Sequence, residues 1–173
     1  MTTFNVDSTL EPNIQFERGF TVDDREGRFN APAAALTDGT ILKVASDGET
    51  FELSGTSDGQ YYSGQNTDVS GPIGSAANRE TYLQGMPMNS VKVSTPIWAM
   101  PHKPGAVIKT KKFVTGTATG ALTALTVTIG STLLEHYGGE WRIRQSSNKV
   151  MGKVINFDAT NGWVTIFLME GIT

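Results

Sequence analysis

The stretch that decides the fold runs from Lys149 to Met169 and reads KVMGKVINFDATNGWVTIFLM. Two apolar runs rich in β-branched residues flank the turn-forming sequence DATNG, and this arrangement predicts a β-hairpin. Successive side chains of a strand point to opposite faces. The second run therefore has two faces, made of Trp163, Thr165, Phe167 and Met169 on one side and Val164, Ile166 and Leu168 on the other.

Both faces of this predicted strand are apolar, which is typical of a strand that is buried on two sides or covered by a partner subunit. The first run contains Gly152 at an interior position. A glycine inside a strand predicts either a β-bulge or the close approach of another chain segment.

The rest of the chain also favours strands. It holds 19 glycines among its 173 residues, and Thr and Ser are frequent, a composition that suits short strands and turns. Asp38-Gly39, Asp47-Gly48 and Gly138-Gly139 predict turns. We expect an all-β protein, a small barrel or sandwich of about eight short strands. Besides the terminal hairpin, the expected strands cover residues 41–44, 50–53, 90–98, 106–114, 121–129, 132–137 and 140–144.

The chain divides into two predicted parts. Residues 1–35 show neither helical periodicity nor strand alternation, yet they carry isolated large apolar side chains, so we interpret them as an extended N-terminal arm; an unstructured terminus is the alternative. Residues 36–173 form the predicted β domain, with a Gly-, Ser- and Asn-rich loop insertion at 57–90 that has room for a short helix at 75–83. The apolar residues of the arm are Phe4, Leu10, Ile14, Phe16, Phe20 and Phe29.

Little in the sequence points to catalysis. Cysteine is absent, which excludes disulfides, Cys-ligated metals and thiol nucleophiles. Neither His102 nor His136 has a carboxylate at the spacing of a metal site, and we interpret each as a structural or surface histidine. No serine lies in a nucleophile elbow, and no glycine-rich stretch has the form of a phosphate loop. We expect no catalytic residue, no cofactor and no metal; two carboxylates that meet in space remain an open possibility.

Charge is distributed unevenly. Residues 1–90 hold 13 acidic and 5 basic residues, a balance of −8, and residues 91–173 hold 4 and 9, a balance of +5. This asymmetry is either incidental or a sign that the acidic part of one molecule lies near the basic part of another. The single basic cluster KTKKF has no interleaved aromatic residues, so we expect no nucleic-acid binding. No apolar run is long enough for a transmembrane helix and no signal peptide is evident, so we expect no membrane association and synthesis in the cytoplasm.

Two segments resemble a known family. The early strand sequence LTDGTILKV and the terminal hairpin, with Gly152-Lys153-Val154, Asn161-Gly162 and the run Val164 to Leu168, are similar to capsid decoration proteins of tailed bacteriophages, also called cement or head-stabilisation proteins. The resemblance covers about half of the chain.

The resemblance implies a structural virion protein without enzymatic activity. Such a protein is a β-rich homodimer or homotrimer, assembled in the host cytoplasm, that binds the outside of the capsid and stabilises contacts between major capsid protein subunits. The candidate capsid or oligomer contacts are the six apolar residues of the arm together with Trp163 and Phe167 of the terminal hairpin. The alternative is a carbohydrate- or receptor-binding β module of a phage tail or fibre, for which the candidate aromatic residues are Tyr61, Tyr62, Tyr82 and Trp98.

Overall fold

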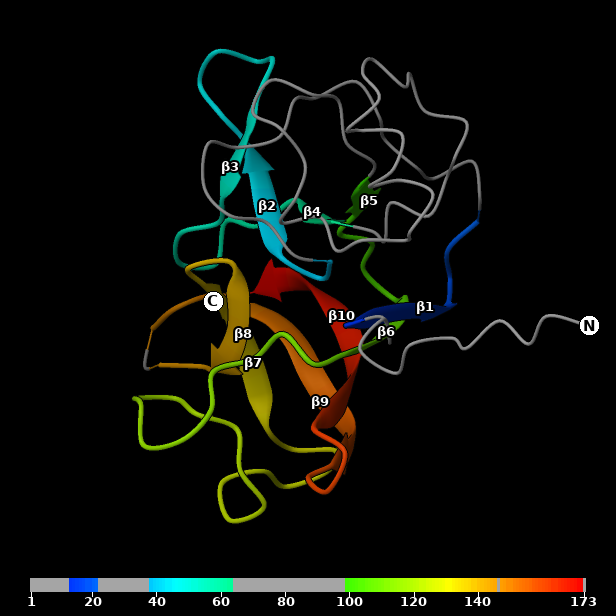
Figure 1. Ribbon diagram of the computed structural model, residues 1–173, viewed down its shortest axis with the longest axis vertical. Coiled ribbons are helices and arrows are strands. Elements are labelled where there is room, and N and C mark those ends of the chain that lie inside the picture. The colour runs from blue at the N-terminus through cyan, green and yellow to red at the C-terminus, as the bar shows by residue number, and fades with distance from the viewer. Residues whose placement is uncertain (1–12, 22–37, 64–98, 146, 173) are drawn as a thin grey trace, which may run out of the picture.

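The computed structural model describes residues 13–21, 38–63, 99–145 and 147–172, which form ten β-strands and no helix (Figure 1). The prediction of an all-β protein is confirmed, with nine strands after residue 36 where about eight were expected. The strands are β1 (Ile14–Arg18), β2 (Ile41–Val44), β3 (Phe51–Leu53), β4 (Tyr61–Ser63), β5 (Ala99–Pro101), β6 (Val107–Thr110), β7 (Leu133–Tyr137), β8 (Glu140–Ile143), β9 (Val150–Asp158) and β10 (Trp163–Ile172).

Six strands form the main sheet, in the order β1-β6-β10-β9-β7-β8 with every neighbour antiparallel. The predicted terminal hairpin is β9 and β10, the longest strands of the described chain, at the centre of this sheet. Its turn is set locally, because one Asp158 oxygen accepts hydrogen bonds from the backbone N–H groups of Thr160 and Asn161, each at 3.1 Å. Gly162 follows with a φ of 68°, a conformation that glycine adopts without strain.

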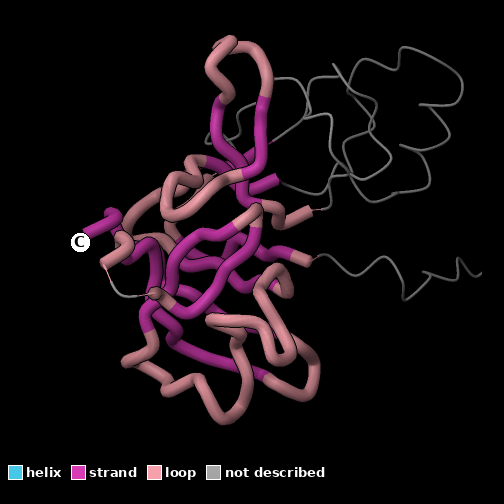
Figure 2. Tube along the Cα trace, turned by 90° about the vertical axis from the view of Figure 1, so that its left-hand side faces the viewer, coloured by secondary structure: helices cyan, strands magenta, loops and turns pink. Residues whose placement is uncertain are grey.

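The other four strands form a small sheet in the order β3-β2-β4-β5. Figure 2 shows the β2–β3 hairpin projecting at one end of the molecule, with long loops at the opposite end. The predicted Asp47-Gly48 turn closes this hairpin. Asp47 accepts hydrogen bonds from the N–H groups of Glu49 and Thr50, and Gly48 has a φ of 70°.

The two sheets are joined at the turn between β7 and β8. The N–H of Ile41 on β2 donates to the carbonyl of Gly139 at 2.8 Å, and Thr56 forms an isolated bridge with Tyr137. The β8 edge of the main sheet contacts the segment that follows β6, because Phe113 forms a parallel bridge with Trp141 on β8. No sheet closes into a barrel, so the architecture is two antiparallel sheets that share one joint.

The core lies on one face of the main sheet and extends beneath the joint. Val164, Ile166 and Leu168 of β10 are fully buried in it. Gly152 of β9 allows close packing, since a Cβ atom at this position would lie 2.6 Å from Cγ2 of Ile166. The close approach predicted from this glycine is therefore present. The buried cluster also includes Ile14, Ile41, Tyr62, Ala106, Ile108, Phe113, Leu122, Leu134, Trp141, Met151 and Val154.

Part of the predicted N-terminal arm belongs to the β domain. Residues 14–18 form β1, the edge strand that pairs with β6. The interpretation that the arm lacks strand alternation is wrong here, because in IQFER the apolar Ile14 and Phe16, which face the core, alternate with polar residues. Asn13 helps to hold the strand, because its side-chain amide donates to Asp38 at 2.7 Å. Residues 1–12 and 22–35 of the arm, the predicted strand at 90–98 and most of the 57–90 insertion lie outside the described residues. Within that insertion, Tyr61 to Ser63 form β4.

The strand predicted at 121–129 is wrong. These residues form consecutive turns instead. Thr126 accounts for the difference, because its hydroxyl bonds to the carbonyl of Ala121 at 2.9 Å and to the hydroxyl of Thr123 at 3.0 Å. Threonine has a high strand propensity, but its side chain also competes for local backbone groups, and here these local bonds prevail over sheet pairing.

Candidate interaction surface

The outward face of the main sheet combines large apolar side chains with lysines. Since Val164, Ile166 and Leu168 point into the core, the alternate residues of β10 point outward. The register then places neighbours beside them on the same face. Phe167 lies opposite Val107 and Lys153, Thr165 opposite Lys109 and Asn156, and Trp163 opposite Asp158.

Trp163 is a largely enclosed side chain of this face, as are Val107 and Thr165. The ammonium groups of Lys109 and Lys111 lie 5.0 and 4.8 Å from its ring centroid, so two cations share one indole. Each such contact contributes about 0.5–1 kcal/mol at a solvent-accessible site. The lysine stems help to cover the ring, and Trp163 is only 8% exposed. The indole therefore holds two positive charges close together on the outer face.

A third lysine, Lys153, lies on the same face beside the half-buried Phe167. The acidic side chain nearest to Trp163 in the register is Asp158. Hydrogen bonds from the side chain and backbone of Asn161 lower the pKa of Asp158, with a smaller effect from the charge of Lys109. The face is thus an apolar row bordered by cations, a composition suited to a partner surface that carries carboxylates.

The structure divides the eight predicted contact residues into three groups: those on the outward face, those packed in the core and those outside the described residues. Trp163 and Phe167 lie on the outward face, as the alternation of side chains along the predicted strand indicates. Ile14 is buried in the core of this molecule, while Phe16 and Phe20 pack against that core and against each other, with ring centroids 5.0 Å apart. These three residues anchor β1 on its own domain. The other three candidates, Phe4, Leu10 and Phe29, lie outside the described residues.

Sequence reasoning missed that the KTKKF cluster has an aromatic partner. The aromatic side chain comes from Trp163, far along the chain, and reaches the lysines through the pairing of β6 with β10. Alternation along each strand shows which residues share a face, but the register between strands cannot be read from either segment alone.

A cluster of polar aromatic residues is buried at the joint between the sheets. Tyr62, His136 and Trp141 are fully buried, and the rings of His136 and Trp141 meet edge to face at 4.4 Å. The ring of His102 lies 5.3 Å from that of His136. His136 therefore has a structural position, and the surface alternative is excluded for it; His102 is half-buried beside it.

The hydrogen bonds assign the protons of both imidazoles. Nε2 of His102 lies 2.7 Å from the carbonyl oxygen of Met169, so Nε2 carries the proton and Nδ1 accepts from the hydroxyl of Tyr62. In His136, Nδ1 accepts from the N–H of Gly59 at 3.1 Å, so the proton is on Nε2. Each histidine is neutral, and this network holds β4, β5, β7 and β10 together.

Burial explains the titration of this cluster. It lowers the pKa of His136 well below its usual value, with a smaller effect from the neighbouring His102. Burial also lowers the pKa of His102, partly offset by its bond to Met169. The pKa of the Tyr62 hydroxyl is raised well above its usual value, again by burial. These three groups stay neutral at physiological pH, so we assign them a role in stability.

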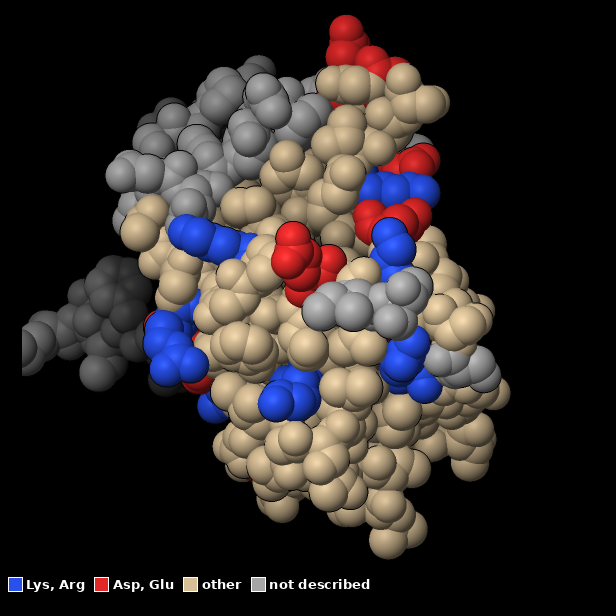
Figure 3. All heavy atoms as spheres, turned by 180° about the vertical axis from the view of Figure 1, so that it is seen from behind, with Lys and Arg blue, Asp and Glu red and all other residues tan. Residues whose placement is uncertain are grey.

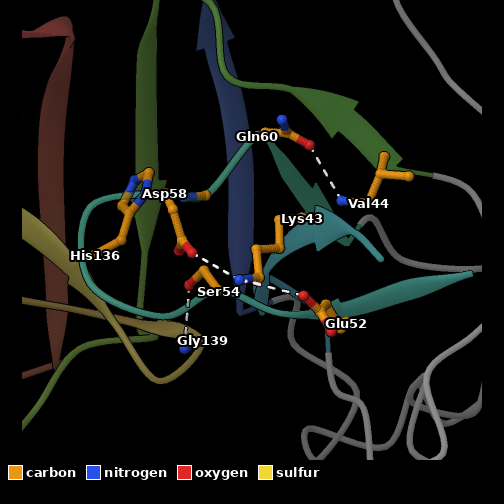
Figure 4. Close-up of polar contacts among 9 residues, drawn as sticks. Lys43, Val44, Glu52, Ser54, Asp58, Gln60, His136 and Gly139 are labelled. Atoms are coloured by element: carbon orange, nitrogen blue, oxygen red, sulfur yellow. Dashed lines mark hydrogen bonds and ion pairs between the residues drawn. The ribbon is translucent and has the colours of Figure 1, made fainter. Parts of the chain in front are cut away.

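Two ion-pair groups lie near the joint. Lys43 on β2 contacts Asp58 at 2.8 Å and Glu52 at 3.2 Å (Figure 4). The hydrogen bond with Asp58 is the main reason that the pKa of Lys43 is raised, and an exposed network of this kind adds little to stability. The second group is buried: Nε of Arg142 on β8 lies 2.5 Å from Oε1 of Glu135 on β7. Its register position makes it a cross-strand pair within the sheet.

Neither a metal site nor an aromatic sugar groove is evident in the described parts of the chain. No group of three or more His, Asp or Glu residues there could hold a metal ion. Of the aromatic residues considered for carbohydrate binding, Tyr62 is buried in the joint, and Tyr61 packs edge to face on Phe51 at 5.2 Å. Tyr82 and Trp98 lie outside the described residues.

The fold and the surface define a class, that of an all-β protein with two antiparallel sheets and one cation-bordered sheet face. No protein-family model, curated protein or solved structure matches the chain. Within the described residues, no helix has the length and apolar character needed to cross a membrane.

Proposed function

We propose that this protein is a structural component of a phage virion. It binds the outside of the capsid and stabilises contacts between major capsid protein subunits, as the resemblance to decoration proteins implies. The observation that carries the proposal is the outward face of β9 and β10, where Trp163 and Phe167 lie among Lys109, Lys111 and Lys153. The segments that resemble the family include this hairpin, which forms the centre of the main sheet.

Contact over an extended area supplies the stabilisation in this proposal, and no bond is made or broken. Phe167, which is half-buried in the free molecule, would contribute further burial, while the lysines would pair with carboxylates of the partner. Because many copies act around one shell, modest affinity at each site suffices. The protein would act at the virion surface as a homodimer or homotrimer, after assembly in the host cytoplasm.

The direct test is to add the purified protein to undecorated phage heads and to image the heads after removal of unbound protein. We expect regular density on the outer surface and a higher temperature of head disruption. Binding should weaken as salt increases, since exposed charge pairs are screened. Heads that stay bare at saturating protein would refute the proposal.

Charge reversal probes the proposed face. Lys153→Glu should weaken binding to heads about tenfold, because a lysine at the interface would then oppose acidic groups. Lys149→Glu is the matched control: this lysine is also exposed, and its carbonyl accepts a hydrogen bond from Ser57 near the joint. Equal losses for both variants would indicate an effect of net charge, and the face would not be the contact.

A further inference from the structure

A loop segment at one end of the molecule carries no charged residue. Between Phe113 and Leu134 the sequence has no Asp, Glu, Lys, Arg or His, in a chain of which 18% is charged. These residues form the loops between β6 and β7, at the lower end of the molecule in Figure 1. Figure 3 shows neither acidic nor basic atoms at this lower end, whereas acidic atoms mark the opposite tip.

Two aliphatic side chains of this uncharged loop face solvent. Leu125 is 98% exposed and Ile129 is 58% exposed, more than the other exposed large apolar residues of the described chain, Leu53 at 36% and Tyr137 at 48%. Isolated surface leucines are common, but here two lie on one loop in uncharged surroundings. The loop is also continuous with the core, since Val127 between them packs against it.

The loop is ordered by its own hydrogen bonds. Thr126 bonds to Thr123 and Ala121, and the N–H of Thr128 donates to the hydroxyl of Thr132 at 2.7 Å. The N–H of Gly130 donates to the carbonyl of Val154 on β9 at 2.8 Å, which fixes the loop to the main sheet. The backbone that carries Leu125 and Ile129 is therefore ordered before any partner binds, and this lowers the entropic cost of binding.

The chemistry of the loop restricts the class of partner. Nucleic acids are bound through Lys and Arg contacts to phosphates, and this segment has neither residue. Segments that lie on membranes combine aromatic or aliphatic side chains with Lys and Arg, and from Val114 to Thr132 there is neither an aromatic nor a basic residue. A protein surface with an uncharged, apolar recess fits the loop best.

We infer that the uncharged loop, Val114 to Thr132, docks into an apolar recess on the outer surface of the major capsid protein, with Leu125 and Ile129 as its anchors. This inference rests on the proposed function and adds a second contact to it. The lysine-bordered face supplies salt-dependent binding, and the uncharged loop supplies binding that salt does not screen. Two contacts of different chemistry, on the sheet and at one end, would allow one molecule to bridge neighbouring capsid subunits.

The experiment compares the double variant Leu125→Ser/Ile129→Ser with the wild type in binding to undecorated heads, at low and at high salt. We expect affinity to fall about ten- to hundredfold for each aliphatic side chain that is buried on binding. The ratio between variant and wild type should be the same at both salt concentrations. Leu53→Ser, at an exposed leucine of the small sheet, is the matched control and should bind as the wild type does.

Folding is checked on each variant by its melting temperature. Because Leu125 and Ile129 are exposed, the double variant should melt within a few degrees of the wild type. Wild-type affinity of the double variant would overturn the inference and leave the proposed function standing, whereas a wild type that fails to bind heads would overturn both. If the double variant changes its oligomeric state but still binds heads, the loop serves self-association. If the wild type binds phosphatidylcholine–phosphatidylglycerol vesicles and the double variant does not, the loop binds lipid. Either result overturns the capsid contact.

Discussion

Mild acidification should destabilise the protein through the buried histidines at the joint. His136 is fully buried and neutral, and its pKa lies well below its usual value. In the unfolded chain the same side chain has a pKa near 6.5. As the pH falls below about 6.5, the unfolded state binds a proton that the folded state does not, so the free energy of unfolding decreases. The loss continues until the pH reaches the pKa of the folded state.

The magnitude follows from this proton difference. At about pH 5.5, one unit below the unfolded pKa, a histidine that stays neutral in the folded state lowers the free energy of unfolding by about 1.4 kcal/mol. His102 adds to the loss in the same direction, because burial lowers its pKa as well. Carboxylates with a lowered pKa, such as Asp47 and Asp158, lose their contribution only nearer their unfolded pKa of about 4, so they do not account for a change in this interval.

The assay is urea unfolding at about pH 7.5 and about pH 5.5, for the wild type and for His136→Asn. The asparagine oxygen can still accept from the N–H of Gly59, but the side chain no longer titrates. The variant should be less stable at both pH values, because it leaves part of the ring volume empty. Its loss between the two pH values should be smaller than that of the wild type by about 1.4 kcal/mol. An identical loss in both proteins would refute the role of His136.

Four further substitutions test the packing and the assignment of the faces, by urea unfolding and, for Phe167→Asp, by head binding as well. Gly152→Ala should lower the free energy of unfolding by about 1–3 kcal/mol, since its Cβ would lie 2.6 Å from Ile166, and an unchanged midpoint would contradict that packing. Ile166→Asp should prevent folding because it buries a charge in the core. Phe167→Asp, at a half-buried position of the outer face, should fold and lose head binding. If Phe167→Asp failed to fold while Ile166→Asp folded, the two faces of β10 would be assigned wrongly. Glu135→Gln leaves an oxygen that can accept from Arg142 but removes the buried negative charge that balances it, so it should cost about 3 kcal/mol, and a neutral result would show that the charge of the pair adds nothing to stability.

The all-β class and several turns follow from the sequence because their causes are local. Asp47-Gly48 forms the turn of the β2–β3 hairpin since its carboxylate and its glycine act within a few residues. The hairpin of β9 and β10 follows in the same way from the alternation of its strands and from the turn between them. Gly152 could be recognised as a site of close packing, although its neighbours could not be named.

The errors arise where local preference competes with other bonds. The threonines at 123–128 favour a strand by propensity, yet their hydroxyl groups bond within the loop and hold it in turns. Residues 14–18, IQFER, do alternate apolar and polar residues, but over only one short stretch of a polar segment; they form β1 because they pair with β6 and because Ile14 packs in the core. The threonine hydroxyls bond within their own loop, whereas β1 depends on β6, a distant segment that the sequence of β1 does not identify.

The properties that the sequence establishes are those carried by neighbouring residues: the strand content, the hairpin turns, the absence of cysteine and the uncharged run from Phe113 to Leu134. The pairing of Lys111 with Trp163, the burial of His136 and the exposure of Leu125 required the folded chain. Strand register, burial and exposure depend on which distant segments meet in space, and long-range packing sets those meetings.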